Sequence, residues 1–256
     1  MTLSSSSLRR WSGGLLSAAL LLHPVTRTLA GESPSKASKN PITPVAAPPS
    51  NPLSFADGKV VFDFEEKLRF EFRDNNFDFN SANDALTDDS WLLEHTRLGL
   101  LLKPTPWFKF YVQGQDAREF DSDRPNVPGV LGAEGDDTFD FRQLYIELGQ
   151  QKGLSLKLGR QLLSYGDERL IGPLEWNNLS RSWDAAKLRY EADKWWLDAF
   201  AGSLVVIGDD ELNRSDLFNN DGLGRNQVLS GLYFSTTALD FQTTDLYAFY
   251  LHEEFP

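Results

Sequence analysis

The chain has 256 residues, a formal net charge of −12 and 41% hydrophobic residues. This acidic balance argues against a general nucleic-acid-binding protein, because no basic tract offsets it. Cysteine is absent, which excludes disulfides, thiolate catalysis and cysteine metal ligands, and no apolar run after the N-terminal region reaches the roughly 18 residues of a helical membrane span.

The N-terminal segment has the layout of a secretory signal peptide. Arg9 and Arg10 form a positive region, Gly13 to Val25 form an apolar core, and Thr28 to Ala30 offer a small-residue cleavage site. A buried or anchoring helix is the alternative, but the apolar run is short for spanning. We therefore expect residues 1–30 to be a signal peptide. Residues 31–57 are rich in proline, serine and asparagine, and we expect a flexible linker there.

Beyond residue 58 the sequence alternates apolar and polar side chains with a period of two. The first stretch shows this best, because Phe62, Phe64, Phe70 and Phe72 share one parity while charged residues occupy the other. Successive side chains of a strand point to opposite faces, whereas a helix would scatter these aromatics. The pattern predicts nine strands, at residues 60–73, 92–103, 107–118, 139–148, 154–165, 183–191, 195–206, 227–235 and 241–251.

The connections between these strands are alternately long and short. Long polar segments follow residues 73, 118, 165 and 206, and tight turns join the other pairs. Bacterial outer-membrane barrels have long external loops and short periplasmic turns. A soluble β-sandwich or propeller is the alternative, but Greek-key connections would not alternate so strictly. We predict an all-β, antiparallel up-and-down transmembrane barrel from residue 58 to residue 256, incomplete because an odd strand number leaves an unpaired edge.

Catalytic motifs are scarce. His95 and His252 stand alone on predicted strands, and we find no hydrolase or nucleotide-binding motif. Acidic pairs such as Asp88-Asp89 lie in predicted loops, where solvated charge is the simpler interpretation. Residues 219–222 have calcium-loop residue types without EF-hand spacing. We expect no enzyme activity, no metal site and no cofactor.

Basic side chains fall on the polar parity of several strands, among them Lys67, Arg69, Arg97, Lys109 and Arg189. A cation facing lipid at mid-membrane costs about 2–4 kcal/mol in barrels, so these side chains should point inward or sit at a rim. Arginine presents paired donors that match a carboxylate, which favours an anionic solute. The alternative is that the cations pair with inward acidic residues and plug the lumen, the candidates being Asp63, Glu65, Glu71 and Asp198.

Arg160 breaks this pattern, because it shares its parity with Leu156 and Leu158. Three explanations are open. Gly159 could mark a bulge that resets the parity, this face could be the lumen, or Arg160 could face lipid at high cost.

Several stretches resemble the alginate-export family of outer-membrane barrels. The most specific are residues 159–178, GRQLLSYGDERLIGPLEWNN, and 181–186, RSWDAA; weaker ones are 113–119, QGQDARE, and 139–143, FDFRQ. The resemblance implies a larger monomeric barrel, of which this chain would supply half, with an arginine-rich lumen that passes an anionic polyuronate outward. The candidate substrate or lumen-lining residues are Lys67, Arg69, Arg97, Lys109, Gln113, Arg118, Arg142, Arg160, Arg169 and Arg189.

These observations predict an outer-membrane channel for passive export or passage of an anionic, alginate-like polysaccharide or oligosaccharide. The main alternative is a porin for uptake of small anions or oligosaccharides. A barrel hydrolase and an adhesive envelope barrel are further alternatives. The expected partners are the anionic solute, outer-membrane lipid and periplasmic export machinery, but no nucleic acid.

Overall fold

The computed structural model describes residues 53–74, 88–126, 133–208, 212–218, 226–239 and 241–253. The predicted signal peptide, the linker up to residue 52 and residues 219–222 lie outside these ranges. Within them, no helix is long and apolar enough to cross a membrane. The elements are β1 (Ser54–Phe55), β2 (Val60–Asp74), β3 (Asp88–Thr105), β4 (Phe108–Phe120), β5 (Asp137–Gly149), β6 (Gly153–Gln161), β7 (Trp183–Glu191), β8 (Trp195–Val206), β9 (Arg214–Ser215), the 3-10 turn η2 (Asp216–Phe218), β10 (Val228–Thr236) and β11 (Thr244–His252).

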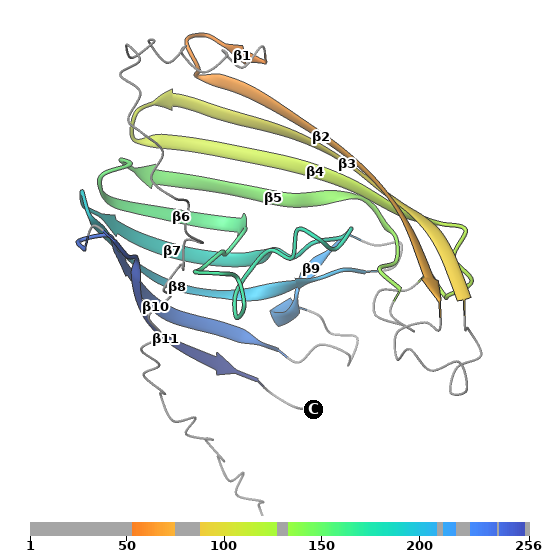
Figure 1. The fold of residues 1–256 in the computed structure, drawn as a ribbon. Helices are drawn as coiled ribbons and strands as arrows, with labels where there is room; N and C mark the ends of the chain where they lie inside the picture. Colours follow the sequence, from red (N-terminus) through yellow and green to blue (C-terminus); the bar gives the residue numbers. More distant parts are fainter. Residues whose placement is uncertain are drawn as a thin grey trace, which may run out of the picture.

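The strands form one antiparallel sheet in which sequence neighbours pair with each other (Figure 1). The order runs from β1 to β11, and only the two-residue β9 leaves this path, pairing with β8. β1 and β11 are the edges of the described sheet, which is therefore open. This confirms the prediction of an all-β up-and-down wall that is only part of a barrel.

The nine predicted strands are present as β2 to β8, β10 and β11, and the differences lie at their ends. β6 ends at Gln161 rather than Tyr165, because Leu163 and Tyr165 leave the sheet and pack back onto it. β3 begins at Asp88, ahead of the predicted start. At the end of the predicted linker, Ser54–Phe55 pair with β2 as the short strand β1.

The sheet curls around residues 162–182, which connect β6 to β7. Tyr165 stacks on Tyr233 of β10 with ring centroids 4.7 Å apart, and Trp176 lies under Arg69 of β2, whose Cζ is 4.6 Å from the ring centroid. On a flat sheet β2 and β10 would lie about 34 Å apart, given strand spacings near 4.8 Å. The segment between Tyr165 and Trp176 is rich in turns and falls short of such a span. We call the concave side that it covers the inner face.

The opposite, outer face is apolar along most strands. Phe62, Phe64, Phe70 and Phe72 are 44%, 59%, 70% and 68% exposed, and Phe62 and Phe64 pair with Leu100 and Leu98 of β3 on the same face. Among the described elements, neither a helix nor a second sheet covers them. A continuous apolar surface of this size is typical of a wall that contacts lipid.

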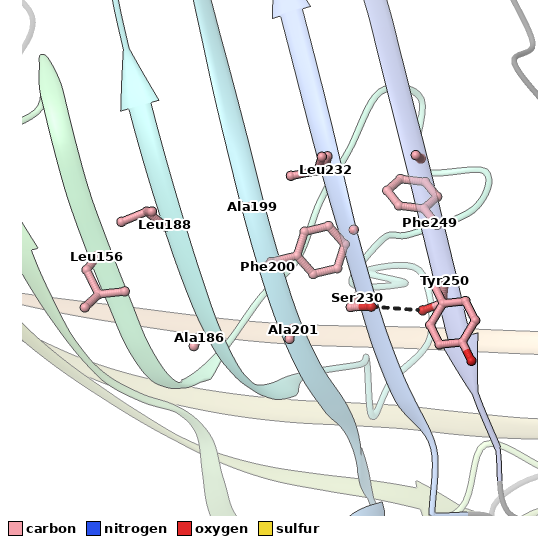
Figure 2. A pocket seen from close by; sticks show the side chains of 12 residues that line it. Leu156, Ala186, Leu188, Ala199, Phe200, Ala201, Ser230, Leu232, Phe249 and Tyr250 are labelled. Atoms are coloured by element: carbon pink, nitrogen blue, oxygen red, sulfur yellow. Dashed lines mark hydrogen bonds between the residues drawn. The ribbon is translucent and has the colours of Figure 1, made fainter. Parts of the chain in front are cut away.

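Small side chains hollow the outer face into an open groove of about 650 Å³ across β7, β8, β10 and β11 (Figure 2). Leu156, Leu188, Leu232 and Tyr250 frame it. Ser230 Oγ, on its floor, donates to the carbonyl oxygen of Tyr250 at 3.4 Å, so the wall itself satisfies this hydroxyl. The groove thus continues the apolar surface.

Candidate functional site

The connection between β6 and β7 attaches to the inner face through two arms. Its first part, which we call the apolar arm (residues 163–171), buries Leu163, Tyr165 and Ile171 against Phe200 of β8 and Tyr233 of β10. The Tyr165 hydroxyl donates to Asp198 Oδ2 at 3.0 Å. Its ring stacks on Phe200 with centroids 5.2 Å apart. This contact is mainly apolar.

The second part, the polar arm (residues 175–180), lies on β2 to β5. Asn178 is fully buried, and its Nδ2 donates to the carbonyl oxygens of Glu94 and Arg118 at 2.9 and 3.1 Å. The Asn178 carbonyl accepts from Nδ1 of His95 at 3.0 Å. Gln115 Nε2 donates to the carbonyl of Leu179 at 2.9 Å. Hydrogen bonds, rather than apolar packing, hold this arm.

Two arginines of the wall converge on Glu175, at the start of the polar arm. Arg97 Nη1 lies 2.9 Å from Glu175 Oε2, and Arg142 Nη2 donates to Glu175 Oε1. Both arginines are buried, whereas the Glu175 side chain is 45% exposed. Burial alone would raise the pKa of Glu175, but Arg142 and then Arg97 outweigh burial and hold this pKa below the ordinary glutamate value.

Side chains of the strands fix the positions of both arginines. Arg97 Nε donates to Gln115 Oε1 at 2.7 Å, and its Nη1 lies 3.2 Å from Glu65 Oε2. Arg142 Nη1 donates to Gln113 Oε1 at 3.0 Å. From the arm, Ser180 Oγ accepts from Arg97 Nη2 at 2.6 Å. The two guanidinium groups thus form a pair that the wall itself orients.

Cations of β2 hold the backbone of the polar arm. Lys67 Nζ donates to the carbonyls of Glu175 and Trp176 at 2.9 and 3.1 Å. Arg69 also donates to the carbonyl of Trp176, and it pairs with Glu134. These cations therefore bind the connection rather than face an empty lumen.

A second group of cations lies outside the polar arm, and carboxylates of the strands pair with these cations. Lys109 Nζ lies 2.6 Å from Glu147 Oε1. Arg189 binds Asp198 through two donors, at 2.6 and 2.9 Å, while its Cζ lies 4.2 Å from the Trp196 ring centroid. The sequence left open whether the inward cations bind a solute or pair with inward acidic residues. At Lys109 and Arg189 they pair with acidic residues.

The chain can now be placed among known proteins. Residues 59–254 match the family described as alginate export. The chain belongs to the alginate export family. No curated protein matches it. Membership in this transport family, together with the all-β wall, points to an outer-membrane polysaccharide export channel rather than an enzyme.

The alginate export fold brings four of the predicted site residues to the polar arm, Lys67, Arg69, Arg97 and Arg142. A fifth, Gln113, accepts from Arg142 on the wall. Lys109 and Arg189 also lie on the inner face but pair with carboxylates of the strands. Arg169 is an exposed residue of the connection itself. The remaining two, Arg118 and Arg160, are placed differently.

Arg118 lies on the outer face, on the parity of Phe110 and Val112. It binds Asp116 through two donors, at 2.7 and 2.8 Å. With the usual strand tilt, the rise from Phe108 to Arg118 is about 25 Å, which is the height of the apolar band of a barrel. The pair is therefore about one such height away from Phe108 on the outer face, and Arg118 does not lie among the inward side chains.

Arg160 occupies an opening between β5 and β6, which separate above the Leu144–Arg160 pair. Its Nε donates to Asp184 Oδ1 at 3.0 Å, and its Nη atoms donate to the carbonyls of Phe141 and Asn213 at 3.0 and 2.9 Å. The register continues through Gly159 without a shift, so no bulge resets the parity. Arg160 can lie on the outer side of its strand because these partners satisfy the hydrogen-bond donors of its guanidinium group.

Sequence reasoning missed Glu175, Asn178 and Ser180. Glu175 and Asn178 lie in the stretch that resembles the family signature, and this position was the available signal for them; Ser180 lies between the two family-like stretches. The stretch was assigned to an external connection, where polar residues need no partner. In the part of the chain that the structure describes, no group of three or more His, Asp or Glu residues could hold a metal ion.

Proposed function

We propose that this protein is an outer-membrane channel through which an anionic polysaccharide passes along the cationic inner wall. The observation that carries the proposal is the Arg97–Arg142 pair, which converges on one carboxylate, that of Glu175. Paired guanidinium donors match a carboxylate in both charge and geometry. A chain of uronate residues would present such carboxylates one after another.

The two faces of the sheet support passage rather than catalysis. The outer face is apolar and the inner face carries fixed cations, as a wall between lipid and water requires. Selective conduction needs binding that replaces hydration yet remains weak enough for release. Wall cations shared with Glu65, Glu147 and Asp198 meet that need, because the acids moderate the attraction for a passing anion. In this proposal, residues 1–30 direct the chain to the envelope.

Planar-bilayer recordings of the full-length protein test this function. The measurements are the reversal potential in a salt gradient and the block of current by an oligouronate or by a neutral oligosaccharide of equal length. We expect anion selectivity and block by the oligouronate alone. Replacing Arg97 and Arg142 together by glutamine should weaken both effects. Lys152→Gln is the control, because Lys152 lies in the turn between β5 and β6 with its side chain 73% exposed. Equal block by both sugars would contradict the proposal.

A further inference from the structure

A carboxylate of the chain itself occupies the guanidinium pair of the inner wall. Each oxygen of Glu175 contacts a different arginine, Oε2 with Arg97 and Oε1 with Arg142. We propose that Glu175 is a built-in competitor for uronate carboxylates, and that a polyuronate binds the wall by displacing Glu175 from Arg97 and Arg142. This inference rests on the proposed function and adds the site at which the solute first binds.

The wall would keep this site in place after Glu175 leaves. Three of the groups that orient the two arginines, Gln113, Gln115 and Glu65, belong to strands rather than to the arm. Arg142 Nε is also buried without a hydrogen-bond partner, although buried donors are normally satisfied. One donor of Arg142 is thus unused by the wall, and the geometry of the pair is preorganised.

Glu175 is the accessible member of the cluster. Its side chain is 45% exposed, against 2% for Arg97 and 5% for Arg142. A solute must therefore meet Glu175 before it reaches the guanidinium groups. Because water already screens the ion pairs of this half-exposed carboxylate, breaking them costs less than breaking those of a fully buried carboxylate.

The backbone around Glu175 favours a local displacement. Leu174 and Ser180 bracket this part of the chain with φ angles of 52° and 61°, in the left-handed region that non-glycine residues rarely adopt. Residues 174–176 are exposed, whereas Asn178 is fully buried and bonded to β3 and β4. The Glu175 side chain can therefore swing away while both arms stay attached.

The test compares wild type, Glu175→Gln and Glu168→Gln in planar bilayers, with an oligouronate as blocker. Glu168 is the matched control because it lies in the same connection, is exposed, and accepts from Ser164 Oγ at 2.6 Å. Glu175→Gln keeps the side-chain shape but removes the competing charge. We expect its half-blocking concentration to fall about tenfold, a typical coupling between two binding events, while Glu168→Gln matches wild type.

Two other results would overturn the inference in distinguishable ways. If the oligouronate blocks all three proteins at the same concentration, Glu175 does not compete, and the proposed channel function stands. If the oligouronate blocks none of them, the proposed function and this inference both fail. Far-UV circular dichroism of each protein in detergent shows that the variants keep the β-sheet.

Discussion

The inner face has two unlike walls beneath a single connection. On β2 to β5 the wall is charged and amide-rich, and it holds the polar arm through hydrogen bonds to Asn178 and ion pairs to Glu175. On β8 to β11 the wall is aromatic, and it holds the apolar arm by packing. Packing changes little with salt or pH, whereas ion pairs respond to both. The connection is therefore held by packing on one side, while on the other side its Glu175 contact responds to salt and pH.

Stacked rings hold the aromatic wall together. Tyr233 stacks on Trp196 and Tyr247 with ring centroids 5.3 and 5.6 Å apart, and each such pair adds about 0.5–1.5 kcal/mol beyond its burial. By contrast, Glu175 is half exposed, and water and salt screen its ion pairs. The difference predicts that the apolar arm determines whether the connection stays inside, while the polar arm determines what else can bind there.

The largest effect is expected at Gly159 of β6, between the two walls. Its φ is +117°, and a Cβ added there would collide with the carbonyl oxygen of Leu144. Gly159→Ala should prevent correct pairing of β5 with β6, as measured by the folded fraction after refolding in detergent. Gly153→Ala is the control, because its φ is +94° but the space around it is open; it keeps only the backbone strain, roughly 1–3 kcal/mol. If both variants lost the same folded fraction, backbone strain would explain the effect and the collision with Leu144 would not be needed.

The next effect tests the apolar arm. Leu163 is fully buried, and Leu163→Ala should cost about 2–5 kcal/mol, releasing the arm from the aromatic wall. Limited proteolysis should then cleave within residues 162–182, equally at low and high salt. Leu170→Ala, in the same arm but 66% exposed, should leave cleavage at the wild-type rate. A strong salt dependence in Leu163→Ala would mean that charge, rather than packing, holds this arm.

The sequence predicted the strands of the wall better than the connection, residues 162–182, that covers its inner face. A period of two shows which side chains share a face, and this places Phe62 and Arg97 on opposite sides. It cannot show whether Leu163 and Tyr165 continue a strand, because packing onto a sheet produces the same alternation. The parity of Arg118, shared with Phe110 and Val112, already indicated the outer face; the family resemblance favoured the lumen. Glu175 could not be found, because its partners come from β3 and β5, far away in sequence.

Acid should release the Glu175 side chain from the wall while both arms stay attached. The lowered pKa of Glu175 means that its ion pairs are complete above the ordinary glutamate value and are lost as the pH falls through the lowered value. Conductance in the absence of polysaccharide should therefore change in a step below the ordinary glutamate range. Glu175→Gln should lack this step, and Glu168→Gln should keep it. A step that persists unchanged in Glu175→Gln would assign it to another carboxylate.

The smallest effect is expected where an ion pair lies outside both walls. Lys152 and Asp193 pair at 2.5 Å between two short turns, with side chains 73% and 83% exposed. Because water screens such a pair and ordering two long side chains opposes it, Lys152→Ala should leave the thermal unfolding midpoint and the oligouronate block as in wild type. A loss of block in this variant would mean that the wall acts through its total charge. If the block does not change, the effect of Arg97 and Arg142 comes from the contact of both guanidinium groups with one carboxylate. Lys152 makes no such contact.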